Sequence, residues 1–259
     1  MNNNFDLTGK VALITGGNGG IGLAFATGIA KAGGAVCIWG RNKEKNEQAL
    51  KLIRETGAKA EAVICDVSNE KSVKESFKAT LDTFGRVDGC FANAGVIGND
   101  SSFIDRPFND WRKLMSINLD GVFLTLQVAA RHMVERAKRG DAFGRLVITS
   151  SMASRMGAAR NEDYGASKCA VNGLSKALAV ELARYKITSN TILPGWVESE
   201  MTHQLVGNDK FNEKVISRVP LRRWGNAAEF ENIAVYLMSN GSGFHTGDEI
   251  LIDGGYTQY

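Results

Sequence analysis

Short, continuously apolar segments alternate with longer amphipathic segments along almost the whole chain. Between the apolar segments, hydrophobic residues recur every three or four positions, which predicts helices over about 19–32, 43–56, 69–84, 108–137, 162–184 and 227–239. Strands without polar alternation need helices on both sides, so the pattern predicts an α/β domain with a doubly wound parallel sheet. The predicted strands are Val11–Thr15, Val36–Trp39, Ala62–Cys65, Gly89–Ala92, Leu146–Thr149, Thr191–Leu193 and Ile250–Ile252.

The bulk composition indicates one domain, 1–259, and argues against two classes of partner. No Pro/Ser/Gly-rich linker divides the 259 residues. The formal net charge is only +3, and the basic cluster at 136–139 lacks the interleaved aromatic residues of a nucleic-acid surface. No segment approaches the roughly 18 uninterrupted apolar residues that span a bilayer. We therefore expect neither nucleic acid nor a membrane as a partner.

Two further features concern the compartment and metals. Residues 1–6 are polar and contain no apolar signal core, which predicts a cytoplasmic location. The four cysteines, at 37, 65, 90 and 169, show no CxxC or other metal-like spacing, and the first three fall inside predicted strands. We interpret the cysteines as buried thiols and expect no metal site.

A glycine-rich turn joins the first predicted strand to the first predicted helix. Glycines permit unusual backbone angles and a close approach to a pyrophosphate, while the helix N-terminus presents unpaired N–H groups to the anion. An ordinary glycine-rich turn is the alternative, but the position in the first βαβ unit favours a dinucleotide. The residues predicted to bind it here are Gly16, Asn18, Gly20, Ile21 and Gly22.

The end of the second predicted strand bears on which dinucleotide is bound. A free ribose 2′-hydroxyl usually meets an Asp or Glu about 20 residues beyond the glycine turn, and this chain has no acid there. Trp39 is followed instead by Gly40 and Arg41, whose guanidinium can pair with a 2′-phosphate. We therefore expect NADP(H) to be favoured and NAD(H) to be possible, with a solvent-facing Arg41 as the alternative.

Tyr164 and Lys168 form a candidate proton-transfer unit. On a helix, residues four apart lie on one face with Cβ atoms roughly 5–6 Å apart. A free phenol has a pKa near ~10 and donates or accepts protons poorly at neutral pH unless a nearby positive charge stabilises the phenolate. Ser151 precedes this pair by thirteen residues, after the fifth predicted strand. A solvated helix face would explain the pair alone equally well.

Several motifs in order along the chain resemble those of the short-chain dehydrogenase/reductase family. They are Gly16…Gly20-Ile21-Gly22, Ala92-Asn93-Ala94-Gly95, Ser151, Tyr164-Gly-Ala-Ser-Lys168 and Pro194-Gly195, and together they cover nearly the whole chain. The resemblance implies a Rossmann-type fold and a catalytic tetrad of Asn118, Ser151, Tyr164 and Lys168.

The resemblance also implies a role for each member of the tetrad. Ser151 would polarise the substrate carbonyl, and Tyr164 would give its oxygen a proton or remove one from the alcohol. Lys168 would stabilise the phenolate and hold the nicotinamide ribose, helped by the positive charge of the oxidised nicotinamide. Asn118 would anchor a water that connects the lysine to solvent, or it is a buried structural amide.

Further cofactor contacts follow from the same resemblance. Asp66 and Val67 would border the adenine, although Asp66 beside Ser68 also suits a helix cap, with Ser68 itself a plausible N-cap. The remaining residues implied to line the cofactor are Asn93, Ala94, Gly95, Pro194, Gly195 and Val197.

The substrate pocket is expected beyond the carboxyl ends of the strands, after Ser151 and after Gly195. A lid is expected over about 196–217, and His203 either contacts substrate or is an exposed histidine on this lid. The pocket candidates, Ser151, Met152, Ala153, Met156, Tyr164, Trp196, Met201 and His203, are mostly apolar and favour a hydrophobic or cyclic alcohol or ketone over a sugar. Two departures from the family pattern are Ser199 in place of Thr and an unusually charged segment between Arg155 and Asp163.

The leading hypothesis is an NAD(P)(H)-dependent oxidoreductase that interconverts a secondary alcohol and a ketone. By resemblance, its substrate would be like that of 3-oxoacyl reductases or of sugar, polyol or cyclic alcohol dehydrogenases, and the enzyme would be a homotetramer. The alternatives are a non-catalytic nucleotide-sensing protein on the same fold, and an epimerase or dehydratase that uses the Tyr/Lys pair. The latter group normally has a longer C-terminal domain than the roughly 60 residues after Gly195 allow.

Overall fold

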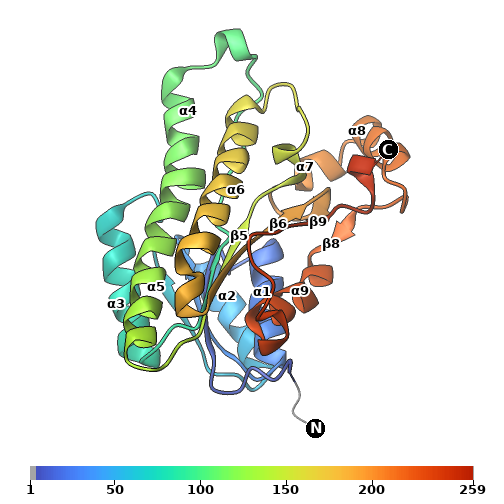
Figure 1. The fold of residues 1–259 in the computed structure, drawn as a ribbon. Helices are drawn as coiled ribbons and strands as arrows, with labels where there is room; N and C mark the ends of the chain where they lie inside the picture. The colour runs from blue at the N-terminus through green and yellow to red at the C-terminus, as the bar shows by residue number, and fades with distance from the viewer. Residues whose placement is uncertain (1–3, 259) are drawn as a thin grey trace.

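The apolar segments form a parallel sheet in the computed structural model, which describes residues 4–258 (Figure 1). Within these residues the sheet has seven strands in the order β3-β2-β1-β4-β5-β6-β9, and every neighbouring pair is parallel. The expected doubly wound α/β fold is confirmed. The strands of this sheet are β1 Val11–Thr15, β2 Ala35–Gly40, β3 Ala60–Ile64, β4 Gly89–Ala92, β5 Gly144–Thr149, β6 Ile187–Pro194 and β9 Glu249–Ile252.

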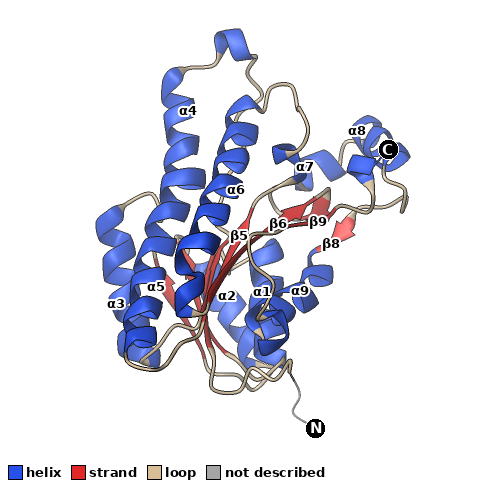
Figure 2. Cartoon of the chain, viewed as in Figure 1, coloured by secondary structure: helices blue, strands red, loops and turns tan. Residues whose placement is uncertain are grey.

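Helices cover both faces of the sheet (Figure 2). The α-helices are α1 Gly20–Lys31, α2 Lys43–Arg54, α3 Glu70–Phe84, α4 Phe108–Met115, α5 Gly121–Lys138, α6 Glu162–Leu182, α7 His203–Val206, α8 Asp209–Arg218 and α9 Glu231–Met238. Short 3₁₀ turns are η1 Phe103–Asp105, η3 Met152–Ser154, η4 Ala183–Tyr185, η5 Ala227–Phe230, η6 Asn240–Ser242 and η7 Tyr256–Gln258, and η2 Ser116–Asp120 is a π-helical turn.

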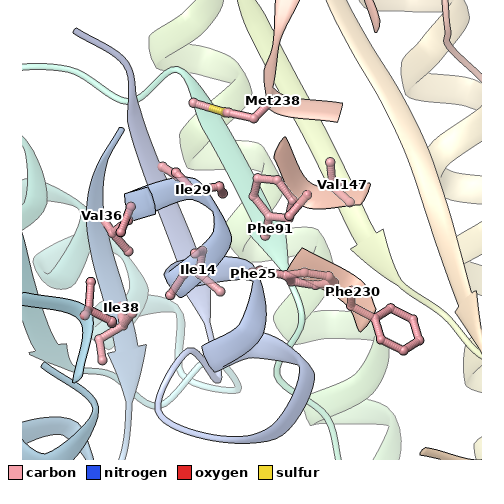
Figure 3. Packing of buried hydrophobic residues seen from close by; sticks show 14 of the residues in the cluster. Ile14, Phe25, Ile29, Val36, Ile38, Phe91, Val147, Phe230 and Met238 are labelled. Atoms are coloured by element: carbon pink, nitrogen blue, oxygen red, sulfur yellow. The ribbon is translucent and has the colours of Figure 1, made fainter. Parts of the chain in front are cut away.

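Successive strand residues point to opposite faces, so the sheet separates two apolar cores. On one face, Ile14 and Ile38 pack with Phe25 of α1 and with residues of α2 and α9 (Figure 3). On the other face, Leu13 and Trp39 pack with residues of α3, α5 and α6. Burial on both sides explains why the strands are continuously apolar, as the sequence pattern indicated.

The strand order reverses between β1 and β4, which both lie at the centre of the sheet. The chain leaves β1 toward one neighbour and β4 toward the other, so the loops after these strands diverge at the carboxyl edge. In doubly wound sheets, a crevice for ligands forms at such a point. The glycine-rich turn follows β1 and the segment Asn93–Gly95 follows β4, so both lie at this crevice.

The long helix expected over 108–137 is interrupted. It consists of α4, the π-helical turn η2 and α5, and the π-helical turn contains Asn118. Two contacts accompany the irregular turn: the amide of Asn118 bonds the backbone of Val96, and Gly121 lies so close to Val67 that a Cβ would approach its Cγ2 to 2.8 Å. Single π-helical turns of this kind often occur at functional sites.

The region after β6 contains elements that the sequence pattern did not indicate. Val197–Glu198 (β7) pairs in parallel with Gly225–Asn226 (β8) to form a small second sheet. Between these two strands lie α7 and α8, which occupy the expected lid region beyond the ends of β6 and β9 (Figure 1). A third apolar cluster, built around Trp224 and Tyr256, packs this region against the C-terminal segment.

The part of the chain between residues 4 and 258 contains no helix with the length and apolar character that crossing a membrane requires. Residues 1–3 of the polar N-terminal run lie outside the described residues, as does residue 259. Cys37, Cys65 and Cys90 are buried free thiols as expected, but Cys169 is exposed. The exposed cysteine lies on α6, and its thiol donates to the carbonyl oxygen of Ser154 at 3.2 Å.

Candidate active site

The glycine-rich turn has the backbone geometry of an anion-binding loop. Gly16 and Gly20 have φ values of +63° and +50°, which favour glycine. A Cβ on Gly22 would lie 2.2 Å from the carbonyl oxygen of Gly16, so the first turn of α1 packs directly on the loop. The N-cap residue, Gly19, makes no side-chain cap, and the first turn of α1 contains no acid.

Comparison with the other helices indicates which N-terminus is available to an anion. Asn42, Asn69 and Asn208 cap α2, α3 and α8 by accepting a backbone N–H with their side chains. Among the described α-helices, α4, α6 and α9 lack such a cap, but their first turns contain acids. Two others also lack one, but α5 continues the π-helical turn and α7 has only four residues. The N-terminus of α1 has neither a side-chain cap nor an acid in its first turn, so the positive end of its helix dipole is unopposed. The residues present therefore fit the pyrophosphate of a dinucleotide.

A relay of side-chain amides holds the glycine-rich turn against the second strand. Nδ2 of Asn18 donates to Oδ1 of Asn46 at 2.7 Å, and Nδ2 of Asn46 donates to the carbonyl oxygen of Gly40 at 2.9 Å. Asn46 is buried, although it lies in the polar helix α2. Sequence reasoning missed Asn46, and the only signal available was a lone Asn among the charged residues of that helix.

Arg41 lies exposed directly after β2, where no acidic residue stands. Asp66 lies near enough for Arg41 to lower the pKa of its carboxyl group, although hydrogen bonds from Ser68 are the larger cause. Asp66 accepts the backbone N–H of Ser68 at 3.0 Å and its hydroxyl at 2.7 Å. The N-cap of α3 is Asn69 and not Ser68, because the hydroxyl of Ser68 is already used by this turn. Val67 is buried against α5.

Asn93 ties together the carboxyl ends of three strands. Its backbone N–H donates to Oγ1 of Thr15 at 3.0 Å, and its Nδ2 donates to the carbonyl oxygen of Thr15 at 3.1 Å. Its Oδ1 accepts the hydroxyl of Thr149 at 3.0 Å. The backbone N–H of Ala94 also donates to Thr15 at 3.0 Å. These bonds fix the loop after β4 beside the glycine-rich turn.

Tyr164 and Lys168 lie on consecutive turns of α6, as the spacing predicted. Nζ of Lys168 lies 5.5 Å from the centre of the Tyr164 ring and donates to the carbonyl oxygen of Thr149 at 2.8 Å. The hydroxyl of Ser150 donates to the carbonyl oxygen of Lys168 at 3.1 Å. Ser151 follows β5, and its Oγ accepts the backbone N–H of Ala153 at 3.1 Å. The end of β5 and α6 therefore hold three of the four predicted tetrad residues together.

Asn118 completes the set from the π-helical turn. Its Oδ1 accepts the backbone N–H of Val96, and its Nδ2 donates to the carbonyl oxygen of Val96, both at 2.9 Å. A Cβ on Gly95 would lie 3.3 Å from Asn118 Oδ1 and 3.5 Å from Lys168 Nζ. The side chain of Asn118 is thus a structural amide that holds the loop after β4 next to Lys168, which agrees with one of the two interpretations above.

Burial dominates the electrostatics of the pair. It lowers the pKa of Lys168 to about 8, because a desolvated ammonium is disfavoured. Burial also raises the pKa of Tyr164, and a hydrogen bond with Ser151 acts in the opposite direction. Burial outweighs the hydrogen bond, and Lys168 is not among the causes of the shift, so the expected depression of the phenol pKa by Lys168 does not appear. Depression of this pKa by a bound nicotinamide stays a prediction.

The low pKa of Lys168 predicts a pH-dependent difference in stability between the protein and the variant Lys168→Met. Between about pH 8 and 10.5, the unfolded chain keeps the lysine proton and the folded chain has lost it, so stability rises with pH. The difference between a pKa of 10.5 and one of about 8 corresponds to about 3 kcal/mol. From about pH 8 to 10.5, the free energy of unfolding of the wild type, relative to that of Lys168→Met, should therefore rise by about 3 kcal/mol. Urea titrations at several pH values measure it, and parallel curves for the two proteins would contradict the burial effect.

Of the residues at and after the end of β6, some are predicted to contact the cofactor and others belong to the expected lid. Gly195 donates its N–H to the carbonyl oxygen of Ile252 at 2.9 Å, and a Cβ there would lie 2.6 Å from Cα of Asp253, so glycine is required. Pro194 ends β6, and Val197 is buried in β7. All three stay predicted cofactor residues.

Three of the predicted substrate residues, Met152, Met156 and Trp196, lie in the apolar cluster that packs the segment after β6 against the C-terminal segment. Trp196 makes edge-to-face contacts with Phe211, Trp224 and Tyr256, with ring centres 5.4–6.2 Å apart. Met152 is buried in the same cluster. The buried indole N–H of Trp196 finds no acceptor in the part of the chain that the structure describes. Ala153 is partly buried and stays a substrate candidate, as does Met156, which packs beside the cluster.

The lid region contacts the nucleotide side of the crevice at two points. A Cβ on Gly20 would lie 3.4 Å from Cβ of Ser199, and Nζ of Lys45 lies 2.5 Å from Oε1 of Glu200. The hydroxyl of Ser199, which stands in place of the family's Thr, lies 3.2 Å from Oγ1 of Thr202. His203 and Met201 are exposed, and His203 begins α7. The segment expected to form a lid therefore packs beside the glycine-rich turn, with His203 exposed on it, and its role as a lid stays a prediction.

The charged segment before Tyr164 is used within the protein. Arg155 bonds Glu249 of β9, Arg160 pairs with Asp100, and the N–H of Arg160 is accepted by Glu162. These charged side chains of the segment before Tyr164 pair with other residues of the protein and are therefore not available to a substrate. Among residues 4–258, no group of three or more His, Cys, Asp or Glu side chains could hold a metal ion.

Comparison with known proteins places this arrangement among oxidoreductases. The family model described as Enoyl-(Acyl carrier protein) reductase matches residues 16–257. Gluconate 5-dehydrogenase of Gluconobacter oxydans is 34% identical over 253 residues, which cover 98% of this chain and 96% of that protein.

Two crystal structures resemble the whole chain. A short-chain type dehydrogenase/reductase from Mycobacterium marinum superposes with a TM-score of 0.92 at 34% identity, covering 98% of this chain and 97% of that one. A gluconate 5-dehydrogenase from Burkholderia cenocepacia in complex with NADP and tartrate also gives 0.92 at 34% identity, covering 99% and 98%.

Proposed function

Because the chain belongs to the short-chain dehydrogenase/reductase family and is an NAD(P)-dependent oxidoreductase acting on CH–OH groups, we propose that it interconverts a polyhydroxylated alcohol and its ketone. The substrate class is a sugar acid or polyol, such as gluconate. The observation that carries the proposed chemistry is the grouping of Ser151, Tyr164 and Lys168 beside the glycine-rich turn. A nucleotide sensor, an epimerase and a dehydratase are less well supported, because relatives that match this chain over nearly its full length, such as the gluconate 5-dehydrogenase of Gluconobacter oxydans, are named as dehydrogenases or reductases.

The proposed mechanism uses the side chains at the end of β5 and on α6. When bound, the nicotinamide supplies or accepts the hydride. The hydroxyls of Ser151 and Tyr164 would both bond the substrate oxygen, and Tyr164 would donate its proton during reduction. Lys168 would stabilise the resulting phenolate, since its Nζ lies near the ring and its pKa of about 8 leaves it mainly protonated at neutral pH. The glycine-rich turn would hold the pyrophosphate.

Two observations support a hydroxylated substrate over the apolar one that the pocket residues suggested. The side chains of Met152 and Trp196 are engaged in the aromatic cluster that anchors the lid, so they offer less apolar lining than their positions implied. In the part of the chain that the structure describes, the buried indole N–H of Trp196 has no acceptor, and a substrate hydroxyl would supply one. The relatives named as gluconate dehydrogenases point in the same direction.

A crossed substrate panel tests this proposal. The purified protein is assayed with NADPH against 5-ketogluconate, sorbose, a cyclic ketone and a 3-oxoacyl thioester, and with NADP⁺ against gluconate and sorbitol. We expect kcat/KM for the polyhydroxylated compounds to exceed that for the apolar ketones by at least about 100-fold, because a site with hydroxyl partners rejects analogues that lack them. A higher kcat/KM for the cyclic ketone or the thioester would overturn the proposed substrate class.

We also propose that NADP(H) is preferred, because Arg41 is exposed and no acid follows β2. The variant Arg41→Ala should raise the Kd of NADPH by about 10- to 100-fold, because it removes a charge-assisted bond to the 2′-phosphate. The Kd of NADH should hardly change. Lys43→Ala, which removes an equally exposed cation two residues away, is the matched control. An equal loss of affinity for NADPH and NADH in Arg41→Ala would contradict the proposal that Arg41 binds the 2′-phosphate.

The homotetramer and the cytoplasmic location stay predictions. One feature supports assembly through α5 and α6: a groove of about 370 Å³ runs between these helices and is lined by Phe123, Leu126, Val134, Leu174 and Leu178, among others. Its lining also includes Gln127, Arg131, Glu135, Lys138 and Glu181, and a groove of mixed apolar and charged residues on two long helices suits packing against a second copy.

A further inference from the structure

A buried ion pair joins the loop after β4 to the first turn of α6. Nη1 of Arg106 lies 2.7 Å from Oδ2 of Asp163, and the two side chains are only 4% and 1% exposed. Asp163 immediately precedes Tyr164, and its other oxygen, Oδ1, accepts the backbone N–H of Tyr164 at 2.8 Å. One carboxylate thus connects the guanidinium of Arg106 to the backbone of the proposed proton donor.

The guanidinium of Arg106 connects two loops through five hydrogen bonds. Besides Asp163, it donates to Oδ1 and the carbonyl oxygen of Asn99 and to the carbonyl oxygens of Ser101 and Arg160, at 2.7–3.2 Å. Asn99 and Ser101 lie in the β4–α4 loop, and Arg160 lies in the β5–α6 loop. A planar group with several donors suits such a junction, whereas a lysine ammonium is a single point charge.

Gly98 shows how tightly the ion pair is enclosed. A Cβ at this position would lie 2.9 Å from both Nη1 of Arg106 and Oδ2 of Asp163, closer than real Cβ contacts. The backbone of the β4–α4 loop therefore covers the pair directly. Removal of Arg106 would leave the buried carboxylate of Asp163 unpaired, and removal of Asp163 would leave Arg106 with only Glu162, 3.9 Å away. Loss of one partner of a buried pair commonly costs about 3–5 kcal/mol.

A second ion pair joins the same two loops at the surface. Nη1 of Arg160 lies 3.1 Å from Oδ2 of Asp100, with side chains that are 56% and 84% exposed. Exposed pairs contribute at most about 1 kcal/mol. The two pairs differ in burial and in their connection to Tyr164, so the outer pair is a matched control for the inner one.

We propose that Arg106 and Asp163 are positioning residues that fix Tyr164 for proton transfer, an inference that rests on the proposed function of Tyr164. The backbone of Tyr164 is held by Asp163, Asp163 is held by Arg106, and Arg106 is held by the loop that follows the cofactor segment Asn93–Gly95. A net stabilising role does not account for the pair, since buried ion pairs contribute little after desolvation is counted. The ion pair instead fixes the position of Tyr164. Proton and hydride transfer are sensitive to displacements of about 1 Å.

The test separates stability from catalysis with a double-mutant cycle. Arg106→Met leaves the carboxylate of Asp163 unpaired, and Asp163→Asn leaves Arg106 with only the longer pair to Glu162, so each should lower the Tm. The double variant has no buried charge and keeps a side-chain acceptor for the N–H of Tyr164, so most of the Tm should return. Its kcat should nevertheless stay about 10- to 100-fold below wild type, with an unchanged Kd for NADPH, because the five bonds to the loops are lost. Asp100→Asn should leave Tm and kcat unchanged.

A further variant keeps the test decisive if the double variant does not fold. Arg106→Lys keeps the charge opposite Asp163 but not the fork of donors, so its Tm should remain near that of wild type while its kcat falls several-fold. Wild-type kcat in Arg106→Lys, or in a folded double variant, would overturn the inference. Tyr164→Phe is assayed in parallel: if it keeps full turnover, the proposed function fails, whereas an inactive Tyr164→Phe beside fully active Arg106 variants refutes the positioning role alone.

Discussion

Tyr164→Phe is expected to lower kcat by about 10²- to 10⁴-fold while the Kd of NADPH stays within about twofold of wild type. The variant removes only the hydroxyl that would donate the proton, and the ring next to Lys168 is kept. Without this donor, the developing negative charge on the substrate oxygen has only the hydroxyl of Ser151 and water as partners. Steady-state kinetics with the preferred ketone and calorimetric titration with NADPH measure the two quantities.

Tyr185→Phe is the matched control for this substitution. Tyr185 lies in η4, directly after the C-terminal end of α6, and its ring contacts Arg184. Loss of that hydroxyl should leave kcat unchanged. Turnover of Tyr164→Phe equal to that of Tyr185→Phe would remove Tyr164 from the mechanism.

Gly22→Ala is expected to destabilise the fold by about 1–3 kcal/mol and to weaken dinucleotide binding by at least about tenfold. The new Cβ would lie 2.2 Å from the carbonyl oxygen of Gly16 and 2.5 Å from Nδ2 of Asn93. Backbone cannot yield as a flexible side chain can, so α1 must move away from the glycine-rich turn. The N–H groups at its N-terminus then no longer converge on one anion.

Gly19→Ala provides the control for stability within the same turn. Gly19 has an extended backbone, with φ of −175°, and a Cβ there meets no atom within 4 Å. Its unfolding free energy should therefore stay within about 1 kcal/mol of wild type, since a small entropic gain opposes a weaker N-cap. Thermal and urea unfolding of Gly22→Ala and Gly19→Ala measure the two stabilities. Equal destabilisation would show that the close approach at Gly22 does not cause the loss of stability in Gly22→Ala.

The fold and the family were predictable because their signals are local and repeated. Each strand is a short apolar run, and each covering helix has its own apolar spacing, so errors at element ends did not alter the topology. The departures have physical reasons. β6 begins at Ile187 and not at Thr191, because Ser189 and Asn190 are buried with hydrogen-bond partners on α6 and on the segment before β9, which apolar patterning cannot reveal.

The candidate site residues stay predictions, but part of their arrangement could be foreseen from the sequence. Tyr164 and Lys168 share a helix face because their spacing imposes it. The π-helical turn at Asn118, the amide relay through Asn46 and the ion pair of Arg106 with Asp163 were not foreseen, since each depends on partners distant in sequence. Trp196 was predicted to line the pocket, and its ring is engaged in the aromatic cluster under the lid.

The amino-acid sequence by itself determined the βαβ order, the glycine-rich turn and the shared helix face of Tyr164 and Lys168, because these depend on periodicity and on residue types within one or two elements. Only the tertiary structure decided which charged side chains remain exposed to solvent and which are buried in ion pairs. Arg41 is left at the surface, while Arg106 is enclosed with Asp163. Both are arginines in loops after strands, and they differ only in what the rest of the chain packs around them, because desolvation and long-range pairing arise only when distant segments meet.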